Sequence, residues 1–288
     1  MTSYQSPIYK SLAGERAVMA WYDSMLARWP VPYQSLTLPT RHGETFVLAC
    51  GAASAPPLLL LHGAGSNSCA WGGDVVHYAP LYRVFAVDLL GEPGKSAPNR
   101  PDWKGPAYAE WLEDVLDALK LDRATLIGLS QGAWTAVKFA VYQPQRVDKL
   151  VLLTPGGITP DKLSFALRVL PLSLLGRWGM RRINRMVLGG QVVSEEVEEA
   201  LTLIGTQFRA RMGVLPLYSD AELKRLTMPV LLLVGDQDAL RDGKKIAARM
   251  QPLLPHLSAT IIPGAGHALL NTPAHVLPFL AEQSLTAA

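Results

Sequence analysis

Short runs of consecutive apolar residues recur along the chain without alternating polar positions. Strands that are covered on both faces have this pattern, and they are typical of parallel sheets. The pattern therefore predicts a buried, mostly parallel sheet. Its predicted strands are 58–61, 82–87, 125–129, 149–154, 230–234 and 259–262.

The segments between these runs have helical periodicity. Tyr108, Trp111, Leu112 and Val115 recur at the spacing of one helical face, which predicts a helix over 108–119. Further helices are expected over 10–29 and 133–142 and after Thr272-Pro273, where proline suits the first helical position. Before the first buried strand, 34–38 and 45–50 flank Arg41-His42-Gly43 and predict a β-hairpin at the edge of the sheet.

A long insertion separates the strands predicted at 149–154 and 230–234, and proline and glycine interrupt it repeatedly. Ser194, followed by Glu195 and Glu196, marks the start of a helix, because serine caps it and the acids suit its dipole. The expected buried stripe of this helix is Val197, Leu201, Ile204 and Phe208.

These elements predict an α/β fold in which helices cover both faces of the sheet. We expect one core formed by residues 1–156 and 226–288 and a helical cap formed by 157–225. A cap over the site excludes water and shapes the pocket, so this insertion is expected to select the substrate.

Composition narrows the class of protein. Of the 288 residues, 49% are hydrophobic and 18% charged, which is typical of a globular chain. The net charge of +3 is too small to indicate a nucleic-acid partner, and the apolar runs are too short for a membrane span. The first residues lack the organisation of a secretion signal, so we expect a cytoplasmic protein. Two cysteines make no disulfide framework, and Cys50 is expected to be a buried thiol.

The insertion carries the excess positive charge. Residues 157–225 contain ten Lys or Arg and seven Asp or Glu, which is +3, so the rest of the chain is neutral. Arg177, Arg181, Arg182 and Arg185 account for most of this excess. We interpret them as a solvated helical face; the alternative is that they attract anionic substrates to the site.

The segment Gly128-Leu129-Ser130-Gln131-Gly132 matches G-x-S-x-G between a predicted strand and a predicted helix. A tight strand-to-helix turn holds a serine in a strained conformation and exposes its hydroxyl, as a nucleophile requires. The two glycines fit because strand and helix approach closely there. Ser130 is therefore the candidate nucleophile.

An acid and a histidine must follow a nucleophile of this kind, each after a later strand. The run 229–234 ends in Gly235-Asp236-Gln237-Asp238, and 259–262 leads to His267. The order serine, acid, histidine is that of α/β hydrolases. Asp236 and Asp238 compete for the role of the acid.

Catalysis by serine also needs hydrogen-bond donors for the negative charge that develops on the substrate's carbonyl oxygen. We predict the N–H groups of Ala64, in the loop after strand 58–61, and of Gln131. His62 is expected to be structural because it precedes the acid. The other histidines are interpreted as surface or structural residues: His42, His77, His256 and His275. No metal-binding cluster, phosphate loop or dinucleotide fingerprint is present, so no metal or cofactor is expected.

Over nearly its whole length the chain resembles the α/β-hydrolase superfamily and, within it, bacterial carboxylesterases related to those that split naproxen esters. The resemblance lies in Trp29-Pro30-Val31-Pro32-Tyr33, in His62-Gly63 followed by Trp71, and in 88–96 and 108–130. In 88–96 one extra residue separates Gly91 from Gly94 relative to the commoner superfamily form. The superfamily pattern G-x-x-D implies that Asp238 is the acid and Asp236 a turn residue.

The resemblance implies a carboxylesterase-type serine hydrolase that forms an acyl-enzyme through Ser130, Asp238 and His267. A serine nucleophile excludes epoxide hydrolases and haloalkane dehalogenases, which use an aspartate. Carbon–carbon bond hydrolase, thioesterase and cofactor-free perhydrolase remain alternatives, as does a non-catalytic receptor on the same fold. The expected partner is a small-molecule ester, with no nucleic acid and no membrane span, and the sequence leaves the oligomeric state open.

Overall fold

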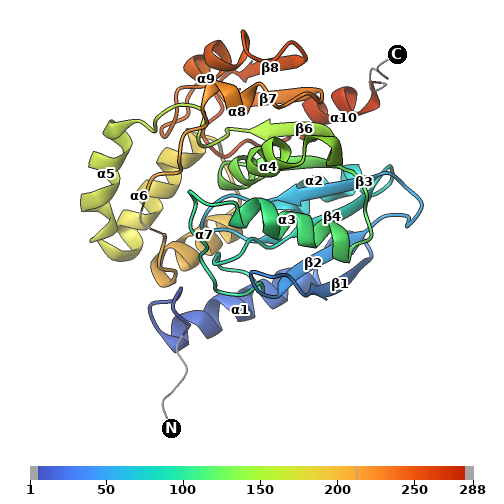
Figure 1. The fold of residues 1–288 in the computed structure, drawn as a ribbon. Coiled ribbons are helices and arrows are strands. Elements are labelled where there is room, and N and C mark those ends of the chain that lie inside the picture. The colour runs from blue at the N-terminus through green and yellow to red at the C-terminus, as the bar shows by residue number, and fades with distance from the viewer. Residues whose placement is uncertain (1–5, 212, 283–288) are drawn as a thin grey trace, which may run out of the picture.

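A computed structural model describes residues 6–211 and 213–282, with an eight-stranded sheet at the centre (Figure 1). The strand order is β1-β2-β4-β3-β5-β6-β7-β8. The strands are β1 (Tyr33–Leu38), β2 (Thr45–Cys50), β3 (Pro57–Leu61), β4 (Arg83–Val87), β5 (Ala124–Leu129), β6 (Val147–Leu153), β7 (Val230–Gly235) and β8 (Leu257–Ile262).

The pairing of the strands agrees with the sequence pattern. The hairpin of β1 and β2 is antiparallel, and β2 also runs antiparallel to β4. The pairs that join β4, β3, β5, β6, β7 and β8 are all parallel. The predicted hairpin and the predicted parallel strands are therefore confirmed.

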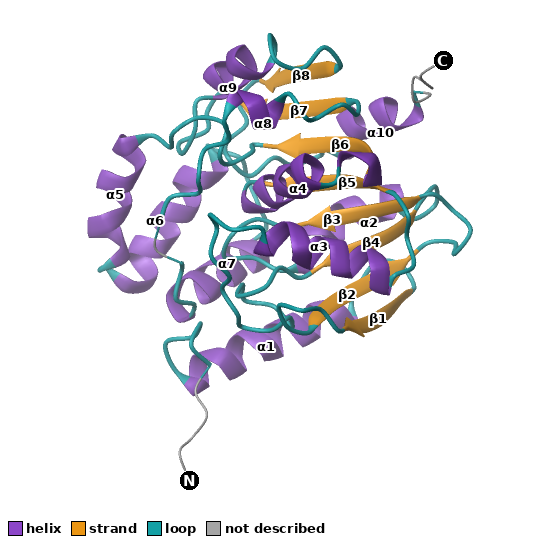
Figure 2. Ribbon diagram, viewed as in Figure 1, coloured by secondary structure: helices purple, strands orange, loops and turns teal. Residues whose placement is uncertain are grey.

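Helices cover both faces of this sheet (Figure 2). The longer helices are α1 (Leu12–Ala27), α2 (Gly72–Tyr78), α3 (Ala107–Ala118), α4 (Gln131–Tyr142), α5 (Leu163–Ser173), α6 (Gly176–Leu188), α7 (Glu195–Gln207), α9 (Gly243–Met250) and α10 (Pro273–Ala281). Short helices are α8 (Asp220–Leu223) and the 3-10 helices Ser68–Trp71 and Pro144–Arg146.

Alternating residues of β3 explain why its sequence is apolar throughout. Leu59 and Leu61 pack in the core that includes residues of α3, α4 and α9. Leu58 and Leu60 pack in a second core with residues of α1, α2 and α10. Successive side chains of a strand point to opposite faces, so a strand between two helical layers needs apolar residues at every position.

The insertion between β6 and β7 forms helices as expected. Helices α5, α6 and α7 pack on one another in this order beyond the carboxyl ends of the parallel strands, and α7 also contacts α1 (Figure 2). Near its end the insertion returns to the sheet, where Tyr218 and Leu223 join the core of α3 and α4. The division of the chain into a core and a cap stays a prediction.

The start of α7 is as predicted, but its buried face differs. The Ser194 side chain accepts a hydrogen bond from Val197 N at 3.3 Å, which caps the helix. The predicted stripe is confirmed at Ile204 and Phe208, which are buried, and wrong at Val197, which is 42% exposed; Thr202 is buried in addition. Helix α7 packs between α6 and α1, so two neighbours determine its buried face and no single periodic stripe describes it.

Candidate active site

Ser130 lies in the turn between β5 and α4 and has the strained backbone that the sequence predicts. Its φ and ψ are 53° and −105°, a conformation unusual for a non-glycine residue. A Cβ at Gly128 would lie 2.5 Å from the backbone nitrogen of Ala133, and one at Gly132 would collide with the Leu61 carbonyl oxygen. The glycines therefore permit the close approach of strand and helix that presents the Ser130 side chain.

The structure brings Ser130, His267 and Asp238 together at the carboxyl ends of β5, β8 and β7. The distance from His267 Nε2 to Ser130 Oγ is 2.9 Å, and His267 Nδ1 lies 2.8 Å from Asp238 Oδ2. All three residues are at least nine-tenths buried. A serine, an imidazole and a carboxylate in this chain of hydrogen bonds can activate the hydroxyl as a nucleophile.

The two competing aspartates have different partners. Asp238 Oδ2 contacts the imidazole, and its Oδ1 accepts hydrogen bonds from Leu240 N at 2.7 Å and Arg241 N at 3.0 Å. Asp236 Oδ1 accepts a hydrogen bond from Gly264 N at 2.7 Å, which ties the turn after β7 to the turn after β8. Only Asp238 therefore lies within hydrogen-bond reach of the histidine.

The surroundings shift the pKa values of both partners downward. Burial lowers the pKa of His267, and the Arg241 charge lowers it further, against an opposing effect of Asp238. Burial alone would raise the pKa of Asp238, but the hydrogen bonds from His267 and from the two backbone N–H groups lower it. The site therefore favours a neutral imidazole beside an ionised carboxylate, which is the state a general base requires.

The predicted oxyanion donors lie on either side of Ser130. Gln131 directly follows the serine, and a Cβ at Gly63, next to Ala64, would be 3.6 Å from Ser130 Cβ. Among the residues that the structure describes, neither Ala64 N nor Gln131 N donates to a backbone oxygen. The assignment of these two N–H groups as oxyanion donors stays a prediction.

Glu92 is a buried residue of the site that the sequence analysis missed. Its Oε2 accepts from Gly65 N at 2.7 Å, and its Oε1 accepts from Gln131 Nε2 at 3.1 Å. Burial raises the pKa of Glu92 to about 7. Its carboxyl group connects the loop that contains Ala64 to the residue after the nucleophile. The extra residue between Gly91 and Gly94 was the available signal, because Glu92 lies in that stretch.

Arg241 is the second residue that the sequence analysis missed. Only 4% of it is exposed, and its Nη1 donates to Ser130 Oγ at 3.0 Å and to Thr154 O at 2.9 Å. Its Nε donates to Asp161 Oδ1 at 2.8 Å. No motif marks this arginine, since only the fold brings the loop after β7 against the serine.

A family model described as alpha/beta hydrolase family matches residues 58–277. The matched segment covers most of the chain and includes Ser130, Asp238 and His267. The chain belongs to the alpha/beta hydrolase family. The resemblance and the fold class inferred from the sequence are therefore confirmed.

Similar proteins in Bacillus subtilis narrow the type of hydrolase. Carboxylesterase YbfK of strain 168 is 30% identical over 88% of this chain and 89% of its own length. The crystal structure of carboxylesterase CesB (YbfK) has a TM-score of 0.85 at 28% identity and covers 94% of this chain and 99% of that chain. Naproxen esterase (carboxylesterase NP) has a TM-score of 0.84 at 28% identity, with coverages of 94% and 98%. The chain is a carboxylesterase-type hydrolase.

The other histidines of this hydrolase lie outside the hydrogen-bonded group. His62 is fully buried, its Nε2 accepts from Leu89 N at 2.9 Å, and its Nδ1 lies 2.8 Å from Gly63 O. Burial lowers the pKa of His62, so its neutral form supports the loop structurally, as predicted. His42 pairs with Glu110 at 3.1 Å, away from the serine.

Within 6–211 and 213–282, no group of three or more His, Cys, Asp or Glu side chains is arranged to hold a metal ion. In the same ranges no helix is long and apolar enough to cross a bilayer.

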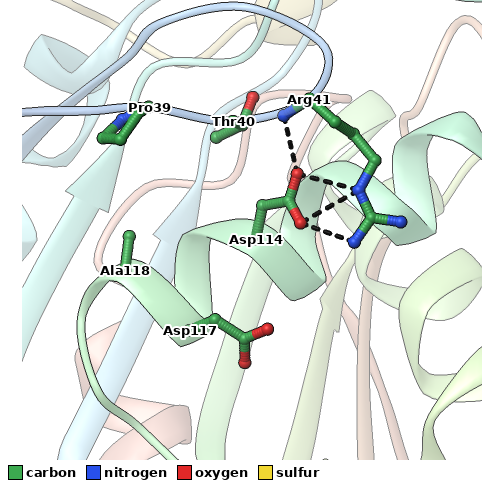
Figure 3. Close-up of a pocket in the computed structure, with 6 residues that line it drawn as sticks. All are labelled: Pro39, Thr40, Arg41, Asp114, Asp117 and Ala118. Carbon is green, nitrogen blue, oxygen red and sulfur yellow. Dashed lines mark hydrogen bonds and ion pairs between the residues drawn. The ribbon is translucent and has the colours of Figure 1, made fainter.

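A surface pocket of about 470 Å³ lies away from the candidate active site (Figure 3). It is lined by residues of the loop after β1 and of α3, which include Thr40 and Asp117. Arg41 and Asp114 form a hydrogen-bonded ion pair at its edge, with Nη2 to Oδ1 at 2.6 Å. No residue of the candidate active site lines this pocket.

Proposed function

We propose that the protein hydrolyses small-molecule carboxylic esters through an acyl-enzyme on Ser130. The hydrogen-bonded series Ser130 Oγ, His267 and Asp238 on a strained strand-to-helix turn is the observation that carries this proposal. The carboxylesterases YbfK and NP of Bacillus subtilis are similar to this chain over most of its length, which supports ester as the substrate class.

Acylation begins when neutral His267 takes the proton of Ser130 through Nε2. The Oγ–carbon bond forms, and the carbonyl electron pair moves to the oxygen, which accepts hydrogen bonds from Ala64 N and Gln131 N. Each such donor contributes about 3 kcal/mol to the transition state in a comparable site. Asp238 holds the Nδ1–H tautomer and stabilises the imidazolium that forms.

Arg241 acts on the same oxygen as His267. Its Nη1 donates to Ser130 Oγ at 3.0 Å, so its charge stabilises the negative charge that develops on Oγ as the proton leaves. When water later attacks the acyl-enzyme, Oγ is the leaving atom, and the same hydrogen bond stabilises its departure. Arg241 thus assists both the formation and the breakdown of the acyl-enzyme.

The remaining steps return the enzyme to its starting state. The imidazolium gives its proton to the ester's alcohol oxygen as the carbon–oxygen bond breaks. Water then loses a proton to His267 and attacks the acyl carbon. The Oγ–carbon bond breaks, the proton returns to Oγ, and the carboxylic acid leaves.

We also assign the segment 157–225 the role of a cap. Its Asp161 binds the Arg241 side chain, and Val187 O, at the end of α6, accepts a hydrogen bond from His267 N at 2.8 Å. Both contacts join this segment to residues of the proposed reaction, so its helices shape the substrate pocket.

Active-site labelling tests the proposal. A fluorophosphonate is expected to modify Ser130 at one equivalent and abolish hydrolysis of p-nitrophenyl acetate. Ser130→Ala is expected to lower kcat by roughly 10⁴–10⁶-fold, because the nucleophile is gone.

The control for this experiment is Ser258→Ala, on the exposed side of β8, which should retain full activity and labelling. Peptide mapping of the modified protein identifies the labelled residue. Labelling of a residue other than Ser130, or an active Ser130→Ala protein, would contradict the proposal.

A further inference from the structure

Helix α5 exposes an apolar face. Leu163, Leu167, Leu170 and Leu174 follow the spacing i, i+4, i+7 and i+11, so their side chains form one stripe. They are 72%, 65%, 65% and 83% exposed, and no residue of α5 is buried. The helix packs on α6 and stands at the outer edge of the molecule, at the left of Figure 1. An amphipathic helix of a globular protein normally turns its leucines inward, whereas these four remain exposed.

The exposed apolar side chains continue around the turn into α6. Leu175 is 53% exposed and Trp178, in the first turn of α6, is 66% exposed. We call these residues the α5–α6 surface: Leu163, Leu167, Leu170, Leu174, Leu175 and Trp178. A contiguous group of this kind on a water-soluble fold marks an interaction site.

The charge of the same segment is uniformly positive. Residues 162–194 contain no Asp or Glu, and their basic residues are Lys162, Arg168, Arg177, Arg181, Arg182 and Arg185. Glutamates of α7 engage part of this charge: Glu199 binds Arg177 and Arg181, and Glu198 pairs with Arg185. In the ranges that the structure describes, Arg168 and Arg182 have no ion-pair partner.

We propose that the α5–α6 surface docks on an anionic lipid bilayer. Exposed leucines and a tryptophan beside arginines are the composition of helices that lie in a membrane interface, where the apolar side chains enter the headgroup boundary and the cations attract anionic lipid. A second copy of the chain fits less well. A two-fold interface places this surface against itself, which adds no acid to pair with Arg168 and Arg182, the two arginines of this segment without an ion-pair partner among the described residues.

The docked surface adjoins the proposed reaction centre. Lys162, just before α5, donates through Nζ to Asp238 O at 2.6 Å and through its backbone N to Leu240 O at 2.7 Å. The bilayer would therefore lie next to the segment that contacts the loop of the proposed acid. The docking itself does not depend on the proposed catalysis, so the two are tested separately.

Co-sedimentation with sucrose-loaded vesicles tests the proposal on the full-length protein. We expect the protein to bind vesicles of phosphatidylglycerol and phosphatidylcholine in equal parts. Binding to pure phosphatidylcholine should be at least several-fold weaker, because the arginines lose their anionic partners. Added salt should weaken the binding to the mixed vesicles by screening. Ser130→Ala should bind like the wild type, which separates docking from catalysis.

Matched variants locate the surface. Leu170→Ser is expected to weaken vesicle binding about tenfold, since one exposed leucine no longer enters the interface. Leu81→Ser, at a leucine that is 57% exposed just before β4, should not change it. Arg182→Gln is expected to weaken binding to the mixed vesicles about fivefold. Arg123→Gln, before β5 at the opposite end of the sheet, removes the same charge without effect.

Circular dichroism and the urea midpoint verify that each variant is folded. Failure of the wild type to bind the mixed vesicles, or equal binding by Leu170→Ser, overturns the proposal. Equal binding to pure phosphatidylcholine also overturns it, because the arginines then contribute nothing. If the wild type is a dimer that Leu170→Ser converts to a monomer, and vesicles are not bound, the surface belongs to a second copy instead.

Discussion

Asp236 and Asp238 are two positions apart, and the structure gives each carboxylate a different task. Asp238 bonds to the imidazole of His267, whereas Asp236 accepts a hydrogen bond from Gly264 N. An asparagine in place of either residue keeps the shape and removes one charge. The pair of substitutions therefore isolates the effect of the carboxylate beside the imidazole.

We predict that Asp238→Asn lowers kcat by about 10³–10⁴-fold, because asparagine favours the wrong tautomer of the histidine. Asp236→Asn keeps an oxygen that can accept from Gly264 N, and any loss should come through the turn, at about 1 kcal/mol of folding stability. Steady-state hydrolysis of p-nitrophenyl esters compares the two. If Asp236→Asn loses activity and Asp238→Asn keeps it, Asp236 and not Asp238 is the acid partner of the histidine.

The base and Arg241 are linked electrostatically. Burial and the Arg241 charge hold the pKa of His267 below its ordinary value of 6.5. The base works only when neutral, so activity is lost as the pH falls through this lowered pKa. We predict that kcat/KM rises with pH along a limb below pH 6.5 and then reaches a plateau.

Replacement of Arg241 tests this link. Arg241→Gln removes the charge, so the acidic limb of the kcat/KM profile should move to higher pH, and kcat should fall about 10-fold to 100-fold as the stabilisation of Oγ is lost. Arg241→Lys keeps the charge, and its limb should stay with the wild type. A Gln variant whose limb does not move, or moves to lower pH, would show that Arg241 does not act on the base.

Single residues of the candidate site differ in how well the sequence predicts them. Ser130, Asp238 and His267 each lie within five residues of the end of a recognisable strand, so local pattern places them at one edge of the sheet. Arg241 comes from a loop without a motif, and the unusual length of 88–96 marks the segment of Glu92 but gives that residue no role; their contacts with Ser130 and Gln131 exist only in the folded chain. Sequence pattern locates strand ends, but it does not locate side chains that reach across from neighbouring loops.

At the scale of elements, the connection from β5 to α4 is the most constrained. A Cβ at Gly132 would collide with the carbonyl oxygens of Leu61 and His62, which are backbone atoms and cannot rotate away. The serine's conformation depends on this approach. Helix α4 therefore packs directly on β3, and this contact keeps the φ of Ser130 at 53°.

We predict that Gly132→Ala lowers the free energy of unfolding by about 2–4 kcal/mol, because the strand and the helix must separate. Urea denaturation measures the change. Gly73→Ala is the matched control: nothing lies within 4 Å of the added Cβ in α2, so helix propensity should leave stability equal or higher. An unchanged unfolding midpoint for Gly132→Ala would show that the turn tolerates a wider spacing.

Helices and strands were predictable from the sequence where the same kind of surroundings along the whole element determines which residues are apolar. Strands between two helical layers are apolar throughout, and α3 has one buried stripe, so both were found from periodicity. Helix α7 was predicted correctly at its start, where the Ser194 cap is local, and at the buried Ile204 and Phe208, but wrongly at the exposed Val197. Its two neighbours, α6 and α1, come from distant parts of the sequence.

At the scale of the whole molecule, two large apolar cores lie on either side of one sheet, a smaller third cluster lies between α1 and α7, and helices α5 to α7 lie beyond the carboxyl edge of the sheet (Figure 1). The sequence predicted the sheet, its helical layers and the presence of this insertion. It did not predict the outward leucines of α5, because periodicity reveals that a stripe exists and not which way it faces. The direction depends on which side of α5 meets α6.

The contact between α6 and the loop after β8 links the insertion to the proposed base. Val187 O accepts from both His267 N and Ala268 N, and a Cβ at Gly266 would lie 2.5 Å from Gly189 N. The backbones are interlocked here, so α6 cannot swing outward at this end without releasing the histidine's own backbone. Any displacement of α6 at this end would therefore also shift the backbone of His267, so the position of the proposed base is coupled to the position of the insertion.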